Sequence, residues 1–275
     1  MSITASTIEE KRARLFLILG MFFITNALLG EFAGTKVFSL ESTLGLAPAD
    51  LSFFGVEHLS FNLTAGVIAW PLVFVLTDII NEYFGRRGVR IISFIAAALI
   101  AYAFIIIYFT INLAPADFWQ FRVQDGERLN MNLAYTAIFG QGLWIIVGSL
   151  VAFLVGQFLD VTVFEFFKSK TGSKKIWLRA TGSTLVSQLI DSFIVLFIAF
   201  YLGAGWSLSQ VLAVCTMNYL YKAVVAIFST PLLYVAHFAI DRYLDMPNES
   251  DLNQSASNEQ LLASAPNDVA SEKLN

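Results

Sequence analysis

Six long apolar runs constrain this chain more than any other feature of its sequence. They cover roughly residues 15–38, 63–84, 89–113, 137–165, 178–202 and 209–240. A helix needs about 20 apolar residues to cross the hydrocarbon layer of a bilayer, and each run reaches that length. Because lipid offers the backbone no hydrogen-bond partners, each run is expected to be a helix rather than a strand. The sequence therefore predicts an all-α integral membrane bundle of six transmembrane helices.

Composition agrees with this fold class, and the lack of catalytic motifs argues against an enzyme. Of 275 residues, 57% are hydrophobic and only 14% are charged, whereas soluble domains carry about 25% charged residues. Cys215 is the only cysteine, which excludes an intrachain disulfide and a cysteine-based metal site. The sequence has no zinc-protease motif, phosphate-binding loop or serine-nucleophile motif. No catalytic residue, metal or cofactor is therefore expected.

The positions of Lys and Arg predict how the spans are oriented. One set of alternate connections and termini holds Lys11, Arg12, Arg14, Arg86, Arg87, Arg90, Lys168, Lys170, Lys174, Lys175, Arg179 and Arg242. The other set holds only Lys36, Arg122 and Arg128. Cytoplasmic connections carry the excess of basic residues in membrane proteins. Both termini are therefore predicted to be cytoplasmic.

Three segments are expected along the chain. Residues 1–14 form a cytoplasmic N-terminus, and residues 15–242 form the six-helix transmembrane domain. Residues 246–275 are polar, acidic and rich in Ser, Asn and Ala, which predicts a disordered cytoplasmic tail. The connection 39–62 is long and contains apolar pieces, so it is compatible with a short interfacial helix.

Polar side chains inside the apolar runs form the candidate site. An ionised group at the bilayer centre costs at least about 2.5–3.5 kcal/mol on insertion scales, so such groups usually mark a functional interior. Three runs each carry two polar residues, one of them ionisable, three or four positions apart, a spacing that puts both on one helix face. The pairs are Gln157 with Asp160, Gln188 with Asp191, and Asn218 with Lys222. We therefore predict that these faces line a shared pocket at the membrane midplane.

Other residues in the runs have weaker signals. Asp78 and Glu82 repeat the polar spacing near the cytoplasmic end of the second run, and Glu31 lies on the outer half of the first. Three aromatic residues could stack on a flat ligand, although such rings more often only pack in the core. They are Trp70, Tyr219 and Tyr221.

A purely structural alternative for the charged residues is that Lys222 neutralises Asp191 or Asp160 and ties helices together. A bare ion pair needs only two groups, whereas carboxylates, carboxamides and an ammonium converge here. A carboxylate accepts two parallel N–H bonds, and a carboxamide both donates and accepts. Together they complement the donor and acceptor edge of a guanine-like base, whose faces aromatic rings would cover. Amino acids, vitamins and protons fit such a lining as well.

Four strings resemble the queuosine precursor transporter family, which is also described as a vitamin uptake family. They are FVLTDIINEYFGRRGVR (74–90), GQFLDVTVFEF (156–166), WLRATGSTLVSQLIDSFIVLFIAF (177–200) and NYLYKAVVAIFSTPLLY (218–234). The resemblance covers roughly residues 65–240. It implies no role for Glu31, the connection 39–62 or the tail.

This resemblance implies a multi-pass protein of the bacterial inner membrane with six spans and a small-molecule substrate. The implied substrate is 7-cyano- or 7-aminomethyl-7-deazaguanine, a precursor of the tRNA nucleoside queuosine. The implied intramembrane polar positions are Asp78, Gln157, Asp160, Gln188, Asp191 and Lys222. The expected partners are the substrate and the lipid bilayer, with no nucleic acid.

Several alternatives stay open at this point. The chain could be the substrate-capture subunit of an ATP-driven vitamin-type uptake system, or a transporter of another small planar nitrogenous solute. Transport could be coupled to protons, or driven by enzymes that retain the product inside the cell. The sequence also does not decide between a monomer and a homodimer.

Overall fold

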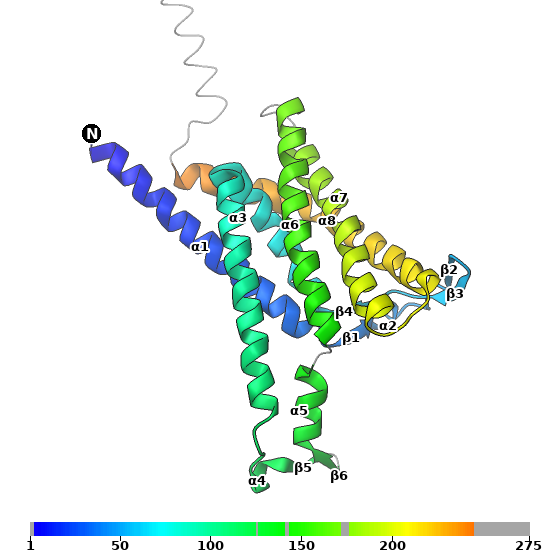
Figure 1. Cartoon of the computed structure of the whole chain (residues 1–275). Helices are drawn as coiled ribbons and strands as arrows, with labels where there is room; N and C mark the ends of the chain where they lie inside the picture. Colours follow the sequence, from blue (N-terminus) through cyan, green and yellow to red (C-terminus); the bar gives the residue numbers. More distant parts are fainter. Residues whose placement is uncertain (1–2, 125, 141–142, 172–175, 245–275) are drawn as a thin grey trace, which may run out of the picture. The chain divides into compact units, whose positions relative to one another are not determined.

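The computed structural model describes residues 3–124, 126–140, 143–171 and 176–244, and it is mostly helical (Figure 1). Its long helices are α1 (Ile3–Ala33), α3 (Trp70–Ile111), α6 (Leu143–Thr171), α7 (Ile176–Leu196) and α8 (Leu208–Tyr243). A π-helical segment, η2 (Phe197–Leu202), extends α7. By length and composition, five helical stretches among the described residues can cross a membrane. The predicted all-α, multi-pass membrane bundle is thereby confirmed.

Two parts of the predicted organisation stay predictions. These are the number of six membrane crossings and the cytoplasmic location of the two ends. The chain divides into two units, Arg14–Leu233 and a second formed by Met1–Ala13 with Tyr234–Asn275. The predicted tail, 246–275, lies outside the described residues. The fold and the site described below belong to the unit Arg14–Leu233.

Helix α3 is folded back on itself. Its 42 residues would extend about 63 Å if straight, twice the thickness of the hydrocarbon layer. Gly85 interrupts it with φ 67° and ψ −177°. The hydroxyls of Thr77 and Ser93, one on each side of the break, donate to the same Oε1 atom of Gln157 at 3.1 and 3.4 Å. Because a straight helix would separate these two residues by about 24 Å, the chain must reverse at Gly85.

The two arms of α3, 70–84 and 86–111, thus occupy the predicted runs 63–84 and 89–113. Two ion pairs hold the reversal against the C-terminal end of α6. Arg86 lies 3.3 Å from Glu165, and Lys168 lies 3.1 Å from Glu82. Arg86 and Lys168, which the sequence assigned to the same side of the membrane, therefore lie at the same end of the bundle.

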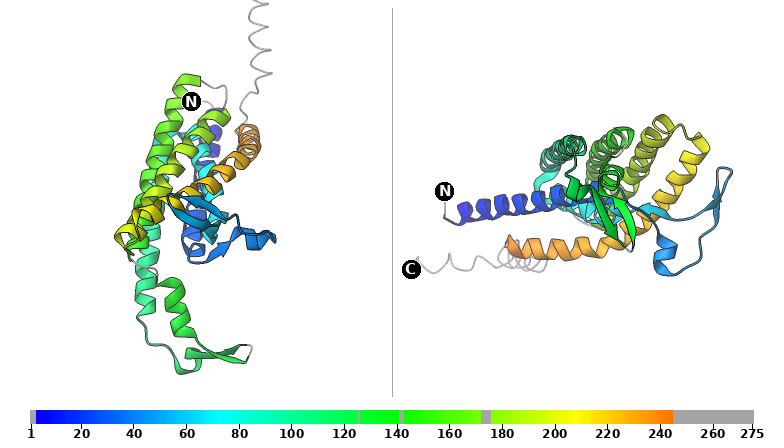
Figure 2. Two further views of the ribbon diagram at one scale, coloured as in Figure 1. Left: turned by 90° about the vertical axis from the view of Figure 1, so that its right-hand side faces the viewer. Right: turned by 90° about the horizontal axis from the view of Figure 1, so that it is seen from below.

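Small residues allow α6 and α7 to pack closely. The second arm of α3, α6 and α7 lie in a row with α6 in the middle (Figures 1 and 2). A Cβ atom at Gly148 would lie 3.2 Å from the Val195 carbonyl oxygen, and one at Gly156 would lie 3.6 Å from the Cβ of Asp191. Glycines of this kind let helix backbones approach in lipid, where no hydrophobic force drives helices together. This approach brings Asp191 against α6.

The core of this unit lies where α1, both arms of α3 and α6 meet. Phe23 of α1, Ile80 and Ile100 of α3, and Phe164 of α6 are almost fully buried. Many large apolar side chains on the outer faces of the helices remain exposed. A soluble protein rarely exposes such continuous apolar surface, whereas a bilayer covers it.

The connections contain short strands and helices. The antiparallel strand pairs are β1 (Val37–Ser39) with β4 (Asn62–Thr64), β2 (Leu51–Phe53) with β3 (Val56–Leu59), and β5 (Phe121–Gln124) with β6 (Glu127–Asn130). The short helices are α2 (Leu40–Leu44), η1 (Ala65–Ile68), α4 (Asp117–Gln120) and α5 (Met131–Phe139). A short helix does occur in the connection 39–62, but the sequence analysis missed the strands around it. Strands of three or four residues are too short for an alternating pattern to be recognised.

Glu41 holds the connection between α1 and α3 together. Its carboxylate is buried and accepts hydrogen bonds from the backbone N–H groups of Phe61 at 2.7 Å and Ala49 at 3.4 Å. The Ser39 hydroxyl donates to its second oxygen at 3.4 Å. Burial raises the pKa of Glu41, but these hydrogen bonds favour the charged form more strongly, so its pKa lies below the ordinary 4.5.

Replacing Gly85 by Ala should destabilise the fold. The conformation of Gly85 lies in a region that is essentially restricted to glycine, and residues forced into such regions cost about 1–3 kcal/mol. A Cβ atom there would meet no neighbour within 4 Å, so the loss reports backbone strain alone. Denaturant unfolding in detergent micelles measures it. Gly45→Ala is the comparison, because Gly45 has φ 70° and ψ 25°, a left-handed conformation that Ala can adopt at a cost of about 1–2 kcal/mol, so its loss should be the smaller of the two. An equal loss in both variants would contradict a special role for the reversal.

The order of the connection should depend on pH through Glu41. A carboxyl group whose pKa is lowered by folding contributes stability above its unfolded pKa and loses it as the pH falls through its folded pKa. We therefore expect amide exchange at Phe61 and Ala49, corrected for intrinsic rates, to be slow at pH 6 and to accelerate below about pH 4.5. Glu41→Gln should show the fast exchange already at pH 6. Unchanged protection in that variant would contradict a structural role for the carboxylate.

Candidate functional site

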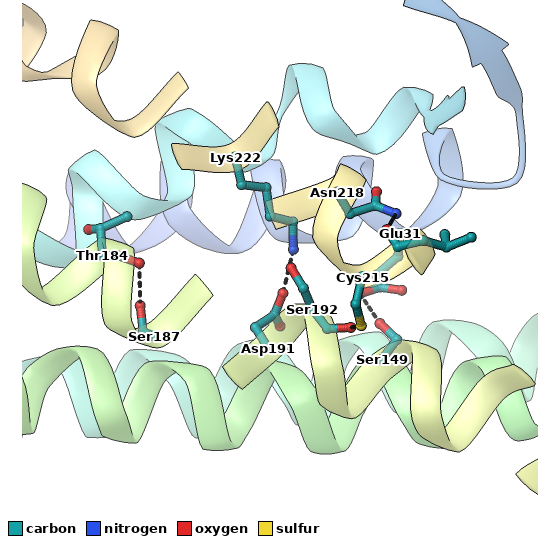
Figure 3. A network of polar contacts seen from close by, with 10 residues as sticks. Glu31, Ser149, Thr184, Ser187, Asp191, Ser192, Cys215, Asn218 and Lys222 are labelled. Atoms are coloured by element: carbon teal, nitrogen blue, oxygen red, sulfur yellow. Dashed lines mark hydrogen bonds and ion pairs between the residues drawn. The ribbon is translucent and has the colours of Figure 1, made fainter. Parts of the chain in front are cut away.

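The candidate site is centred on an ion pair between α7 and α8. Nζ of Lys222 lies 2.5 Å from Oδ2 of Asp191, and each side chain is 20% exposed (Figure 3). The Cys215 thiol donates to the Ser192 carbonyl at 3.1 Å and joins the same two helices. Two of the predicted site residues are thus brought into direct contact. Lys222 neutralises Asp191, which is one of the two pairings that the sequence analysis considered.

The two predicted polar residues of α6 face different neighbours. Asp160 is buried and accepts a hydrogen bond from the Ser187 hydroxyl of α7 at 3.1 Å. Gln157 is buried against α3, where its Oε1 accepts from both arms. Residues three apart on a helix are separated by about 60° around the axis, which is enough to direct them to different helices. The predicted single polar face of α6 is therefore divided.

Two further predicted residues lie near the pair. Gln188 is only 3% exposed, and its Oε1 has no hydrogen-bond partner among the residues that the structure describes. It is a buried acceptor one turn from Asp191 on α7. Asn218 is half-buried on α8 and donates from Nδ2 to the carbonyl of Val214 at 3.0 Å. Its amide is therefore directed along its own helix.

A cleft opens between the first arm of α3, α7 and α8. Its volume is about 540 Å³ counting its open mouth. Its charged lining residues are Asp78 and Lys222, and its aromatic ones are Trp70, Phe74 and Tyr221. Trp70 stacks on Phe74 with their ring centroids 6.1 Å apart. Because Lys222 lines the cleft while bonded to Asp191, the ion pair forms part of its wall.

The predicted site residues are therefore divided between this cleft and the helix interfaces beside it. Those that line the cleft are Asp78, Lys222, Trp70 and Tyr221. Those that are not among its lining residues are Gln157, Asp160, Gln188, Asp191, Asn218 and Tyr219. The cleft thus lies between the second, fifth and sixth predicted spans. The pocket expected from the sequence was lined by the fourth, fifth and sixth.

The sequence analysis missed a group of hydroxyls in the same cleft. Its lining includes Thr181 and Thr184 of α7 and Ser229 and Thr230 of α8. The hydroxyls of Thr181 and Thr230 lie 2.8 Å apart and join the two helices. Ser and Thr are common in membrane helices, where their hydroxyls often bond the preceding turn. Their presence in a run alone therefore gives no reason to single them out.

Glu31 also forms a polar contact between two helices, although the family resemblance gives it no role. Its carboxylate is buried and accepts a hydrogen bond from the Ser149 hydroxyl of α6 at 2.5 Å. Figure 3 shows Glu31 on the Ser149 side of the group, with Ser192 and Cys215 between it and the contact of Lys222 with Asp191. Separate polar pairs therefore join α8 to α7, α7 to α6, and α6 to α1.

Comparison with known proteins gives one matching family. The family model described as "Putative vitamin uptake transporter" matches residues 64–236. A "Probable queuosine precursor transporter" of Bacillus subtilis is 31% identical over 188 residues, which cover 66% of this chain and 74% of the relative. The "Queuosine precursor transporter" of Escherichia coli is 28% identical over 173 residues, covering 62% and 71%.

A third relative, a "Probable queuosine precursor transporter" of Haemophilus influenzae, is 27% identical over 172 residues, covering 62% and 66%. No solved structure matches the chain. The range that the family model matches begins before α3 and ends within α8, so it contains the residues that line the cleft but excludes Glu31.

The Asp191–Lys222 pair should show strong energetic coupling. Removing one partner leaves an uncompensated charge between helices, whereas removing both does not. In a double-mutant cycle of Asp191→Asn and Lys222→Met, we expect a coupling energy of about 0.5–3 kcal/mol in the unfolding free energy. The measurement is reversible unfolding in mixed micelles. The control cycle removes the pair of His58 and Asp50, which is exposed and should couple less strongly.

Proposed function

The chain belongs to the family described as "Putative vitamin uptake transporter", and on this premise we propose that it imports queuosine precursors across the bacterial inner membrane. It is a membrane transporter of a small molecule rather than an enzyme. The proposed substrate class rests on three relatives, at 27–31% identity, that are named as queuosine precursor transporters or probable ones. The proposed substrates are 7-cyano- and 7-aminomethyl-7-deazaguanine.

We place the base in the cleft between α3, α7 and α8. A guanine-like edge presents two adjacent N–H donors beside a carbonyl acceptor. The Asp78 carboxylate can accept both N–H bonds, and the Lys222 ammonium can donate to the carbonyl. Trp70, Phe74 and Tyr221 line the same cleft, and aromatic rings of this kind stack on flat bases. Charged groups and rings in one cleft support this placement.

The polar residues next to the cleft have a positioning role in this proposal. Asp191 contacts Lys222 and fixes the ammonium in the wall of the cleft. Asp160 bonds the α7 hydroxyl of Ser187 and so sets how α7 lies against α6. Gln188 is one turn from the cleft residue Thr184 but does not line the cleft, so its buried side chain acts only on how α7 packs.

Wild-type protein should restore queuosine in tRNA when a host that lacks both queuosine synthesis and its own transporter is fed either precursor. Asp78→Asn and Lys222→Met should lower the initial rate of uptake by roughly 10- to 100-fold, the range for losing a hydrogen bond to a charged group. Asp117→Asn is the matched control, because this residue is exposed in the connection after α3. Uptake is measured with labelled base, and each variant's amount in the membrane is measured in parallel.

The outcomes separate the function from its site. A wild-type chain that inserts but restores no queuosine would reject the proposed substrates. Asp78→Asn or Lys222→Met variants as active as Asp117→Asn would reject the cleft while leaving the function intact. Uptake by the purified chain in liposomes without ATP distinguishes a complete transporter from the capture subunit of an ATP-driven system.

A further inference from the structure

A second cleft lies between the second arm of α3 and α6. It has a volume of about 780 Å³ counting its open side. Arg86 and Arg90 line one end, next to the reversal at Gly85. Phe94, Leu154 and Phe158 are among the apolar residues that line the rest. The cleft therefore combines a cationic end with an apolar body.

The two arginines differ in their surroundings. Arg86 is paired with Glu165 at 3.3 Å and donates to the Thr162 hydroxyl at 3.4 Å. Arg90 is exposed, and it forms no ion pair or hydrogen bond with any residue in the described part of the chain. A guanidinium that lines a cleft without a counter-charge is a suitable donor for an anion, because its planar fork matches carboxylate and phosphate oxygens.

The direction of the cleft follows from the two helices. From Arg86 to Phe94 the axis of α3 advances about 12 Å. Helix α6 runs the opposite way, since Thr162 lies beside Arg86 while Leu154 is about two turns earlier in its chain. The cleft therefore extends from the basic end of the bundle into the apolar zone.

The apolar end of the cleft opens to the outer surface of the helices. Phe94 is 60% exposed and Phe158 is 57% exposed, and in a bilayer the molecules that meet such rings are acyl chains. The polar side chains at the floor, Ser93 and Gln157, are already bonded to each other at 3.4 Å. They are therefore less available to recognise a polar solute.

We propose that this cleft binds one anionic phospholipid of the leaflet that faces the basic end. Its phosphate contacts the guanidinium of Arg90, with Arg86 as a second donor, and an acyl chain lies against Phe94 and Phe158. Basic pockets between membrane helices bind anionic headgroups by this combination of charge and apolar contact. The site is separate from the proposed substrate cleft, and it does not depend on which solute the chain carries.

Native mass spectrometry of the full chain tests the proposal. We expect phosphatidylglycerol to bind at least several-fold more tightly than phosphatidylcholine of the same chain length. Arg90→Gln should weaken phosphatidylglycerol binding by roughly tenfold or more, as for the loss of a hydrogen bond to a charged group. Arg87→Gln is the matched control, since Arg87 is exposed next to Arg86 but does not line the cleft.

Two further measurements distinguish a lipid site from a site for a simple anion. Leu154→Trp keeps every charge but fills the apolar part of the cleft, and it should weaken lipid binding without changing the net charge. Inorganic phosphate should not displace the lipid, because it makes no apolar contact. Displacement by phosphate alone would indicate an anion site and would overturn the proposal.

Three other outcomes would also overturn the proposal. They are equal losses in Arg87→Gln and Arg90→Gln, equal binding of the two lipids by wild type, or a dimer that Arg90→Gln dissociates. The first indicates diffuse surface charge, the second a lack of headgroup recognition, and the third a second protein copy in the cleft. If Leu154→Trp fails to fold, the comparison of Arg90→Gln with Arg87→Gln decides alone.

Discussion

The structure depends on the inability of a bilayer to hydrate polar groups. An ion such as Lys222 would be very costly at membrane depth without a counter-charge, and Asp191 supplies that charge at 2.5 Å. The same constraint explains why Glu31 bonds Ser149 and why Asp160 bonds Ser187. Each of these contacts joins two helices. The polar groups that cannot face lipid therefore also determine which helices pack together.

The reversal of α3 shows how one amide can organise a hairpin. Gln157 of α6 accepts hydrogen bonds from both arms, while Gly85 adopts the backbone conformation that the turn requires. Ion pairs of Arg86 and Lys168 fix the same turn to the end of α6. Because α6 packs against α3 on one side and α7 on the other, it connects the hairpin to the helix that carries Asp191.

The two clefts use the arms of α3 differently. The first arm forms one wall of a cleft with Asp78, aromatic rings and the paired Lys222, which suits a flat, hydrogen-bonding solute. The second arm forms a cleft that is cationic at one end and apolar along its length, which suits an amphiphile. One helical hairpin thus presents both a proposed solute site and a proposed lipid site.

The sequence by itself determined the fold class, the approximate positions of the long apolar helices and the costly residues, because hydrophobic length and buried charge are local properties of the chain. It also placed Asp191 and Lys222 together as one of two pairings. Only the tertiary structure decided that Asp78 and Lys222 share a cleft, that Gln157 and Asp160 face different helices, and that Glu31 bonds Ser149 of α6. These outcomes depend on how each helix is rotated about its axis and on which helix it meets. Residues three apart are always about 60° apart around a helix, but only packing decides whether both face one neighbouring helix or two.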